Sequence, residues 1–335
     1  MNHNTDMSPI PRIPPVTGFK DRRTGLMVFG ILVIIMGCML ALMVPLMLFG
    51  QLMAGRVPGV EPMPMRLLLP GIFMYLGMAV TFIWLGIGSV MCRRWARALL
   101  LIIAWLWLIG GSVGIATMAF ILPQIFAGTI PGAPPGTPAL PNAVRIMITL
   151  FTLAFCSVVY VIIPGALLLF YRSPHVKATC ETRDPVRRWT DACPLPVLAI
   201  SLMLGMGAAM MPLLIGIYHS VVPCFGVYLS GAPAAAILLV TMVVYAWGAR
   251  ANYKLNVAGW WIAVLGFGLW MLSAVVTFAR VGILPMYAIM EFPKAQLDML
   301  RQMDFLNSPS LWMLMMVFWL PFLGFVVYTK KYFRK

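Results

Sequence analysis

The chain has 335 residues, of which 62% are hydrophobic and only 10% are charged. A soluble domain typically carries about a quarter charged residues, so this composition excludes a domain whose surface is covered by polar side chains. The net charge of +15 would suit a nucleic-acid-binding protein. However, no polar segment carries a basic stripe interleaved with aromatic residues, so we expect no nucleic acid partner.

Apolar stretches dominate the chain, and eight of them approach the roughly 20 residues that a helix needs to cross a membrane. They cover residues 25–50, 67–91, 98–121, 146–171, 196–218, 232–249, 257–279 and 310–328. The first is too long for the core of a signal peptide and lacks a small-residue cleavage site, so we interpret it as a span. The sequence therefore predicts an all-α integral membrane protein with eight transmembrane helices.

The positions of Lys and Arg predict the orientation. If the N-terminus is inside, most of the 24 basic residues fall in cytoplasmic segments, as the positive-inside rule requires. Both termini are then cytoplasmic, and the location is the bacterial inner (plasma) membrane, with membrane lipid as a partner. Residues 1–24 are rich in proline and predict a disordered cytoplasmic tail.

An internal repeat divides the chain. Residues of the first span recur at constant spacing in the fifth, and the third and fourth spans share matching positions with the seventh and eighth. Examples are Met36 with Met203, Pro45 with Pro212, Pro123 with Pro285 and Pro164 with Pro321. We expect two parallel four-helix repeats, 25–172 and 196–330, because four spans return the chain to the same side. The linker 173–195 is expected to be too charged to bury.

The paired prolines suggest a binding site between the repeats. Proline inside a span kinks the helix and leaves a carbonyl without its donor, and interrupted helices at matched positions often surround a transporter site. Candidate lining residues are Pro45, Pro212, Pro164, Pro321, Tyr160 and Tyr245. The alternative is that both copies inherited the same bundle shape.

Residues 293–306 predict an amphipathic helix on the outer side. Leu297 and Leu300 fall on one face, whereas Lys294 and Asp298 fall mostly on the other. A helix lying on the membrane interface is the favoured interpretation. A lid over a cavity and a docking helix for a partner remain open.

No Asp, Glu, Lys or Arg lies in the central part of any predicted span, so proton-coupled or acid–base chemistry at depth is not expected. We expect no enzyme, cofactor or metal site. Gly110 and Gly114 fit a small-xxx-small packing pair better than a nucleophile elbow. The methionine stripe that includes Met36 and Met39 is interpreted as packing, with Cu(I) binding left open.

The junction after the second span carries a distinctive motif. It reads Gly86-Ile87-Gly88, followed by Arg93-Arg94-Trp95-Ala96-Arg97. It resembles the inner junction of uncharacterised small bacterial four-helix multi-pass membrane proteins, here in tandem duplicate. The resemblance covers about a fifth of the chain and implies no activity. From the residues alone, Arg93, Arg94, Trp95 and Arg97 are expected to anchor this junction at the membrane interface.

Two functions remain open from the sequence. The first is a non-catalytic scaffold or accessory subunit that packs against other membrane proteins, as charge-free apolar spans would allow. The second is a carrier or binding protein for a neutral or lipid-like molecule, with its site between the two repeats.

Overall fold

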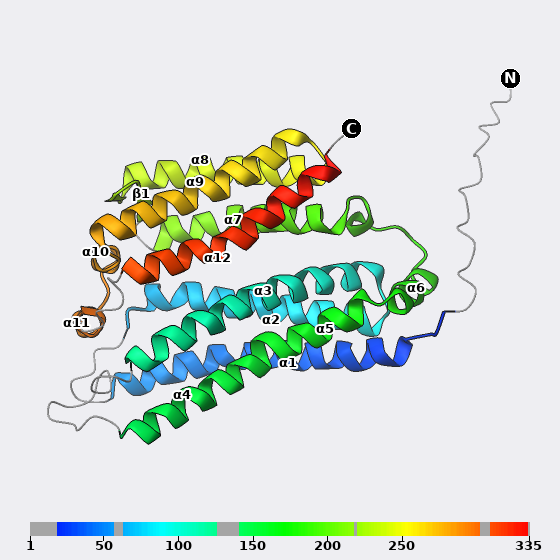
Figure 1. Ribbon diagram of the computed structural model, residues 1–335, viewed down its shortest axis with the longest axis horizontal. Coiled ribbons are helices and arrows are strands. Elements are labelled where there is room, and N and C mark those ends of the chain that lie inside the picture. Colours follow the sequence, from blue (N-terminus) through cyan, green and yellow to red (C-terminus); the bar gives the residue numbers. More distant parts are fainter. Residues whose placement is uncertain (1–18, 57–62, 126–140, 218–219, 302–308, 334–335) are drawn as a thin grey trace.

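The computed structural model describes residues 19–56, 63–125, 141–217, 220–301 and 309–333. Long helices dominate the described chain and lie side by side along its long axis (Figure 1). The first described helix begins and the last one ends at one end of the bundles, here called the terminus end, and the small β-hairpin lies at the other, the hairpin end. The expected all-α class is confirmed, apart from that hairpin.

Seven helical segments in the described part of the chain are long and apolar enough to cross a membrane, which is compatible with a multi-pass membrane protein. They are α1 (Arg23–Ala54), α2 (Met65–Val90), α3 (Arg94–Ile125), α4 with α5 (Asn142–Arg172), α7 (Leu195–Ile217), α8 (Ala232–Tyr253) and α9 (Val257–Val281). The expected eighth element is helix α12 (Pro309–Tyr328).

Helices α1 to α5 form the first bundle, in which α1 and α2 approach most closely. A Cβ atom added at Gly30 would lie 2.9 Å from the carbonyl oxygen of Gly86, and one at Gly86 would lie 2.7 Å from that of Gly30. No other residue fits such a backbone contact. The glycines therefore fix the distance between the two helices, as small residues do between membrane helices.

The fourth long helix of this bundle is interrupted. Helix α4 (Asn142–Ser157) passes through a π-helical segment (Val158–Ile162) into α5 (Ile163–Arg172). Gly111 of α3 lies against this segment, since a Cβ there would be 2.4 Å from the Tyr160 carbonyl oxygen. Gly110 and Gly114 do not pack against another helix of this chain, because a Cβ at either would meet nothing within 4 Å. The glycine of α3 that packs against the π-helical segment is the residue after Gly110, Gly111.

Helices α7, α8, α9 and α12 form the second bundle, which has its own apolar core. Leu204, Leu238 and Ala263 are fully buried there. The Trp260 indole N–H donates to the Val326 carbonyl oxygen at 2.8 Å, which joins α9 to α12.

A hairpin that the sequence did not predict connects α7 to α8. Its strands, β1 (Val222–Cys224) and β2 (Val227–Leu229), pair antiparallel. The backbone N–H groups at its tip donate to side chains of α9: Phe225 to Ser273 at 3.0 Å and Gly226 to Thr277 at 2.9 Å. Two hydroxyls of α9 thus take the place of the missing backbone partners.

The turn from α2 to α3 and the turn from α8 to α9 share one backbone geometry. Cys92 and Leu255 occupy the left-handed region, with φ of 56° and 58°. In each turn, the next residue donates its N–H to a carbonyl five positions earlier, Arg93 to Gly88 and Asn256 to Ala251. This is a Schellman motif built without the usual glycine. Left-handed residues other than glycine are uncommon, so the match is informative.

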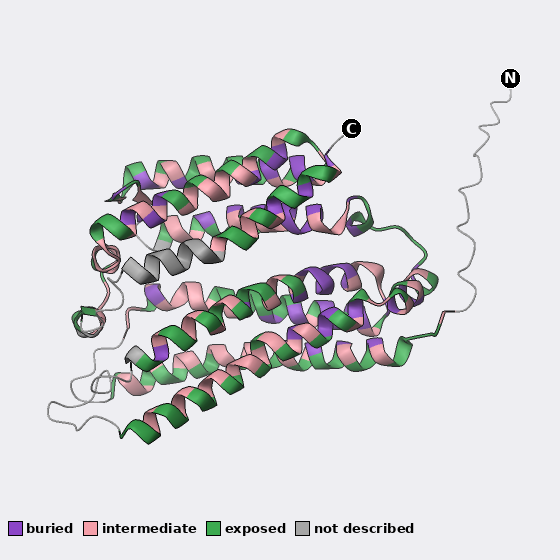
Figure 2. Cartoon of the chain, viewed as in Figure 1, coloured by how far each residue is buried: buried purple, intermediate pink, exposed green. Residues whose placement is uncertain are grey.

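The segment between the bundles folds onto the first bundle. It contains α6 (Pro174–Arg183) and a 3₁₀ turn (Trp189–Asp191). The expectation that its charge would keep it from burying is wrong, because Val176, Cys180 and Asp184 are at most 2% exposed. Its carboxylates have arginine partners, described below. Figure 2 shows that buried residues of the first bundle gather at the terminus end, whereas α4 contains no buried residue.

The end of the expected tail is ordered against this segment. The Lys20 N–H donates to His175 Nδ1 at 3.3 Å, and the Arg22 N–H donates to Thr179 Oγ1 at 3.0 Å. Residues 1–18 of the expected tail lie outside the described residues.

Two short helices follow α9 at the hairpin end. They are α10 (Leu284–Ile289) and α11 (Lys294–Arg301). In α11 Lys294 and Asp298 are exposed while Leu297 and Leu300 are partly buried, which matches the expected amphipathic pattern. Residues 302–306 of the expected helix lie outside the described residues.

Candidate functional site

The residues proposed to line an inter-repeat site lie apart from the contact between the bundles. Pro45, Pro212 and Pro321 are exposed, and Tyr160 is 45% exposed on the π-helical segment. Tyr245 is buried inside the second bundle, where it contacts Gly207 and Gly266. Pro164 is buried in α5 within the first bundle.

The two bundles contact one another through apolar side chains toward the terminus end. Ile102 of α3 packs with Cys193, Leu198 and Ala199, which begin the second half of the chain. The Tyr253 hydroxyl at the end of α8 also donates to the Trp189 carbonyl oxygen at 2.9 Å. These contacts join the two bundles near the terminus end.

A second connection lies at the hairpin end. Arg66 at the start of α2 forms an ion pair with Glu291, which follows α10. Because Arg66 belongs to the first bundle and Glu291 to the segment after α9, the pair joins the two halves. The halves are therefore held together at both ends of the helices.

The arginines of the resembled motif form ion pairs with the segment between the bundles. Asp184 is 2% exposed and forms ion pairs with Arg93 at 3.6 Å and Arg188 at 3.5 Å. Arg94 reaches both Glu181 at 3.6 Å and Asp191 at 3.3 Å. The buried carboxylate has several cationic partners, which is the condition for burying a charge at all.

The other two residues of the motif pack inward. The Trp95 ring stacks on Trp84 with centroids 4.2 Å apart and lies against Gly88. Arg97 has a buried Nε atom without a hydrogen-bond partner. Arg93, Arg94 and Trp95 thus contact protein, and their expected role as interface anchors stays a prediction.

The cysteines of this region are buried thiols. Cys92, Cys180 and Cys193 are at most 7% exposed. Burial raises the pKa of the Cys180 thiol to about 12 and that of Cys193 to about 11. Since the thiolate is the reactive form, neither residue is suited to act as a nucleophile.

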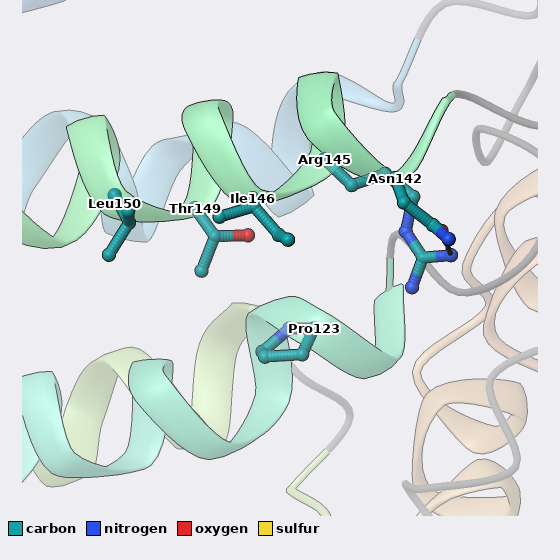
Figure 3. A pocket seen from close by; sticks show the side chains of 6 residues that line it. All are labelled: Pro123, Asn142, Arg145, Ile146, Thr149 and Leu150. Carbon is teal, nitrogen blue, oxygen red and sulfur yellow. Dashed lines mark hydrogen bonds between the residues drawn. The ribbon is translucent and has the colours of Figure 1, made fainter.

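A cavity of about 280 Å³ lies between α3 and α4 at the hairpin end. Figure 3 shows Ile146, Thr149 and Leu150 of α4 pointing toward α3, with Pro123 facing them. Arg145 and Asn142 close its outer end, where the Arg145 guanidinium donates to Asn142 Oδ1 at 3.3 Å. The Arg145 Nε atom is buried and has no hydrogen-bond partner.

The sequence did not single out Asp184, Arg145 or their neighbours. The sequence does contain a signal for Asp184. Only nine acidic residues occur in the chain, and three of them lie close together in this segment, at Glu181, Asp184 and Asp191. Arg145 had a weaker signal, as a lone cation beside an uncharged proline-rich loop.

No protein-family model, curated protein or solved structure matches this chain. Among the described residues, no group of three or more His, Cys, Asp or Glu side chains is placed to hold a metal ion. The residues themselves therefore carry the functional argument.

Proposed function

We propose that this chain is a multi-pass inner-membrane protein that serves as a non-catalytic scaffold or accessory subunit of a membrane complex. Its eight helices form two parallel four-helix repeats, with the terminus end in the cytoplasm and other membrane proteins as partners. The shared Schellman geometry at Cys92 and Leu255 supports the duplication.

The observation that carries this proposal is the connection of the two bundles at both ends. A carrier with its site between the repeats works by rocking one bundle against the other. That motion has to open each end in turn. Here the Arg66–Glu291 ion pair spans one end, and the apolar contact of Ile102 with Leu198 spans the other. A static body suits a subunit that holds partners in place.

The test has two parts. Green fluorescent protein fused after residue 333 should fluoresce because it stays in the cytoplasm, whereas the same protein fused after residue 301 should not. The tagged chain, extracted from its native membrane in a mild detergent, should then retain other membrane proteins at a fixed stoichiometry. A dark C-terminal fusion would refute the orientation, and purification of the chain alone would refute the subunit role.

A carrier or binding protein for a lipid-like molecule is the second candidate. The cavity between α3 and α4 favours it, although this cavity lies within the first bundle and not between the repeats. Lipid mass spectrometry on the same purified sample separates the candidates. A reproducible bound molecule without protein partners would favour this second function.

A further inference from the structure

The geometry points to the cavity between α3 and α4 as a binding site for one anionic phospholipid, with the phosphate at Arg145 and part of an acyl chain against Ile146, Thr149 and Leu150. This inference rests on the proposed insertion in a membrane but not on the scaffold role. The volume of the cavity, about 280 Å³, lies just below the range of volumes that is usual for ligand pockets, about 300–1,000 Å³. It therefore suits a segment of a chain and not a whole lipid.

The shape of the cavity follows from the backbone on both sides. The π-helical segment Val158–Ile162 lies against Gly111 of α3, and beyond it no residue of α4 is buried. Pro123 on the opposite wall has no N–H to donate to the carbonyl of Ala119. π-Helical insertions of this kind are frequent at functional sites.

The charge of the site selects an anion. Among the described residues Arg145 has one side-chain partner, the neutral Asn142, and its Nε atom is buried and unpaired. The first turn of α4 contains no acidic residue and has no side-chain cap, so its free N–H groups also favour a negative ligand. The sequence 126–140, which precedes α4, contains no charged residue.

The depth of Arg145 matches a phospholipid headgroup. The helix Asn142–Arg172 has 31 residues, or about 46 Å at the usual rise. The hydrocarbon layer is about 30 Å thick, so a centred helix extends about 8 Å, or five residues, beyond it at each end. Arg145 and Ile146 fall within those residues, and Thr149 and Leu150 lie in the acyl region directly below them.

Native mass spectrometry of the purified chain, titrated with phosphatidylglycerol or phosphatidylcholine, tests the site. We expect one phosphatidylglycerol to bind more tightly than phosphatidylcholine. Arg145→Gln should weaken that binding about tenfold through loss of charge-assisted hydrogen bonds. Arg56→Gln, an arginine at the same end that does not line the cavity, should leave it unchanged.

A second pair of variants keeps the charge and alters the space. Ile146→Trp places a large ring in the cavity and should reduce binding. Met147→Trp places the same ring on the next residue, which is similarly exposed (63% against 59% for Ile146) but does not line the cavity. Equal affinity for both lipids, no effect of Arg145→Gln, or displacement by inorganic phosphate would overturn the proposal. Failure of the chain to remain in membranes would instead refute the proposed insertion.

Discussion

Replacement of Asp184 by alanine should destabilise the terminus end more than any other single loss of a carboxylate there. The Asp184 side chain is 3% exposed and serves Arg93 and Arg188, which are 36% and 41% exposed. Its Oδ2 atom also lies 3.4 Å from the Arg94 N–H. Removing the carboxylate leaves two cations without their shared partner and opens a gap beneath α6.

The exposure of the arginines sets the magnitude. Breaking a fully buried pair costs about 3–5 kcal/mol, and an exposed pair contributes about 0–1 kcal/mol. Here the acid is buried but both cations reach solvent, so screening lowers the cost to about 2 kcal/mol. Glu181, which is 40% exposed and lies 3.6 and 3.9 Å from its partners, should cost about 0.5 kcal/mol when replaced.

The assay is unfolding of the purified protein by sodium dodecyl sulfate in mild detergent, followed by tryptophan fluorescence. It yields the free energy of unfolding of Asp184→Ala, with Glu181→Ala as the matched control. If Asp184→Ala lowers that free energy no more than Glu181→Ala does, the reasoning from burial is refuted.

Three further predictions use other parts of the structure. Gly111→Ala should lower the free energy of unfolding by about 1–3 kcal/mol, because the new Cβ would meet the Tyr160 carbonyl. Gly110→Ala is the control, since open space surrounds Gly110, and it should be neutral or stabilising in the same titration. Equal effects of the two variants would contradict this reasoning. Tyr171→Phe should cost about 1 kcal/mol in that assay by removing the 2.6 Å hydrogen bond to Ser89, and no loss would contradict it. Cys193 should have about 100-fold less thiolate at pH 8 than a cysteine with the ordinary pKa of 9.0, so its alkylation, mapped by mass spectrometry, should be correspondingly slow. The free energy of unfolding should fall as pH rises above about 9, because the pKa of this thiol is higher in the folded state than in the unfolded state.

The apolar stretches predicted the long helices well, since hydrophobic length depends on residues within each stretch. The fourth shows the limit. The stretch 146–171 is continuous in the sequence, but the structure interrupts it with the π-helical segment. Pro164 has no N–H to donate to the Tyr160 carbonyl, and Gly111 of α3 lies against that carbonyl. The proline is visible in the sequence, whereas the contact with α3 is not.

The segment 173–195 shows a second limit. Its charges predicted exposure when counted alone, yet Arg93 and Arg94 lie about 90 residues away in sequence and neutralise its carboxylates. Pro45 and Pro212 are both exposed, and a binding site lined by the paired prolines stays a prediction.

The placement of Asp184 and Asp191 has a consequence for synthesis of the chain. The four long helical segments of the first bundle can all be made before the segment that holds these carboxylates leaves the ribosome, and until then Arg93 and Arg94 have no acidic partner from it. The first bundle therefore completes the ion pairs at its terminus end only when residues 173–191 emerge. A gene cut after residue 172 would encode the helices without these counter-charges, whereas a cut after residue 193 would encode both.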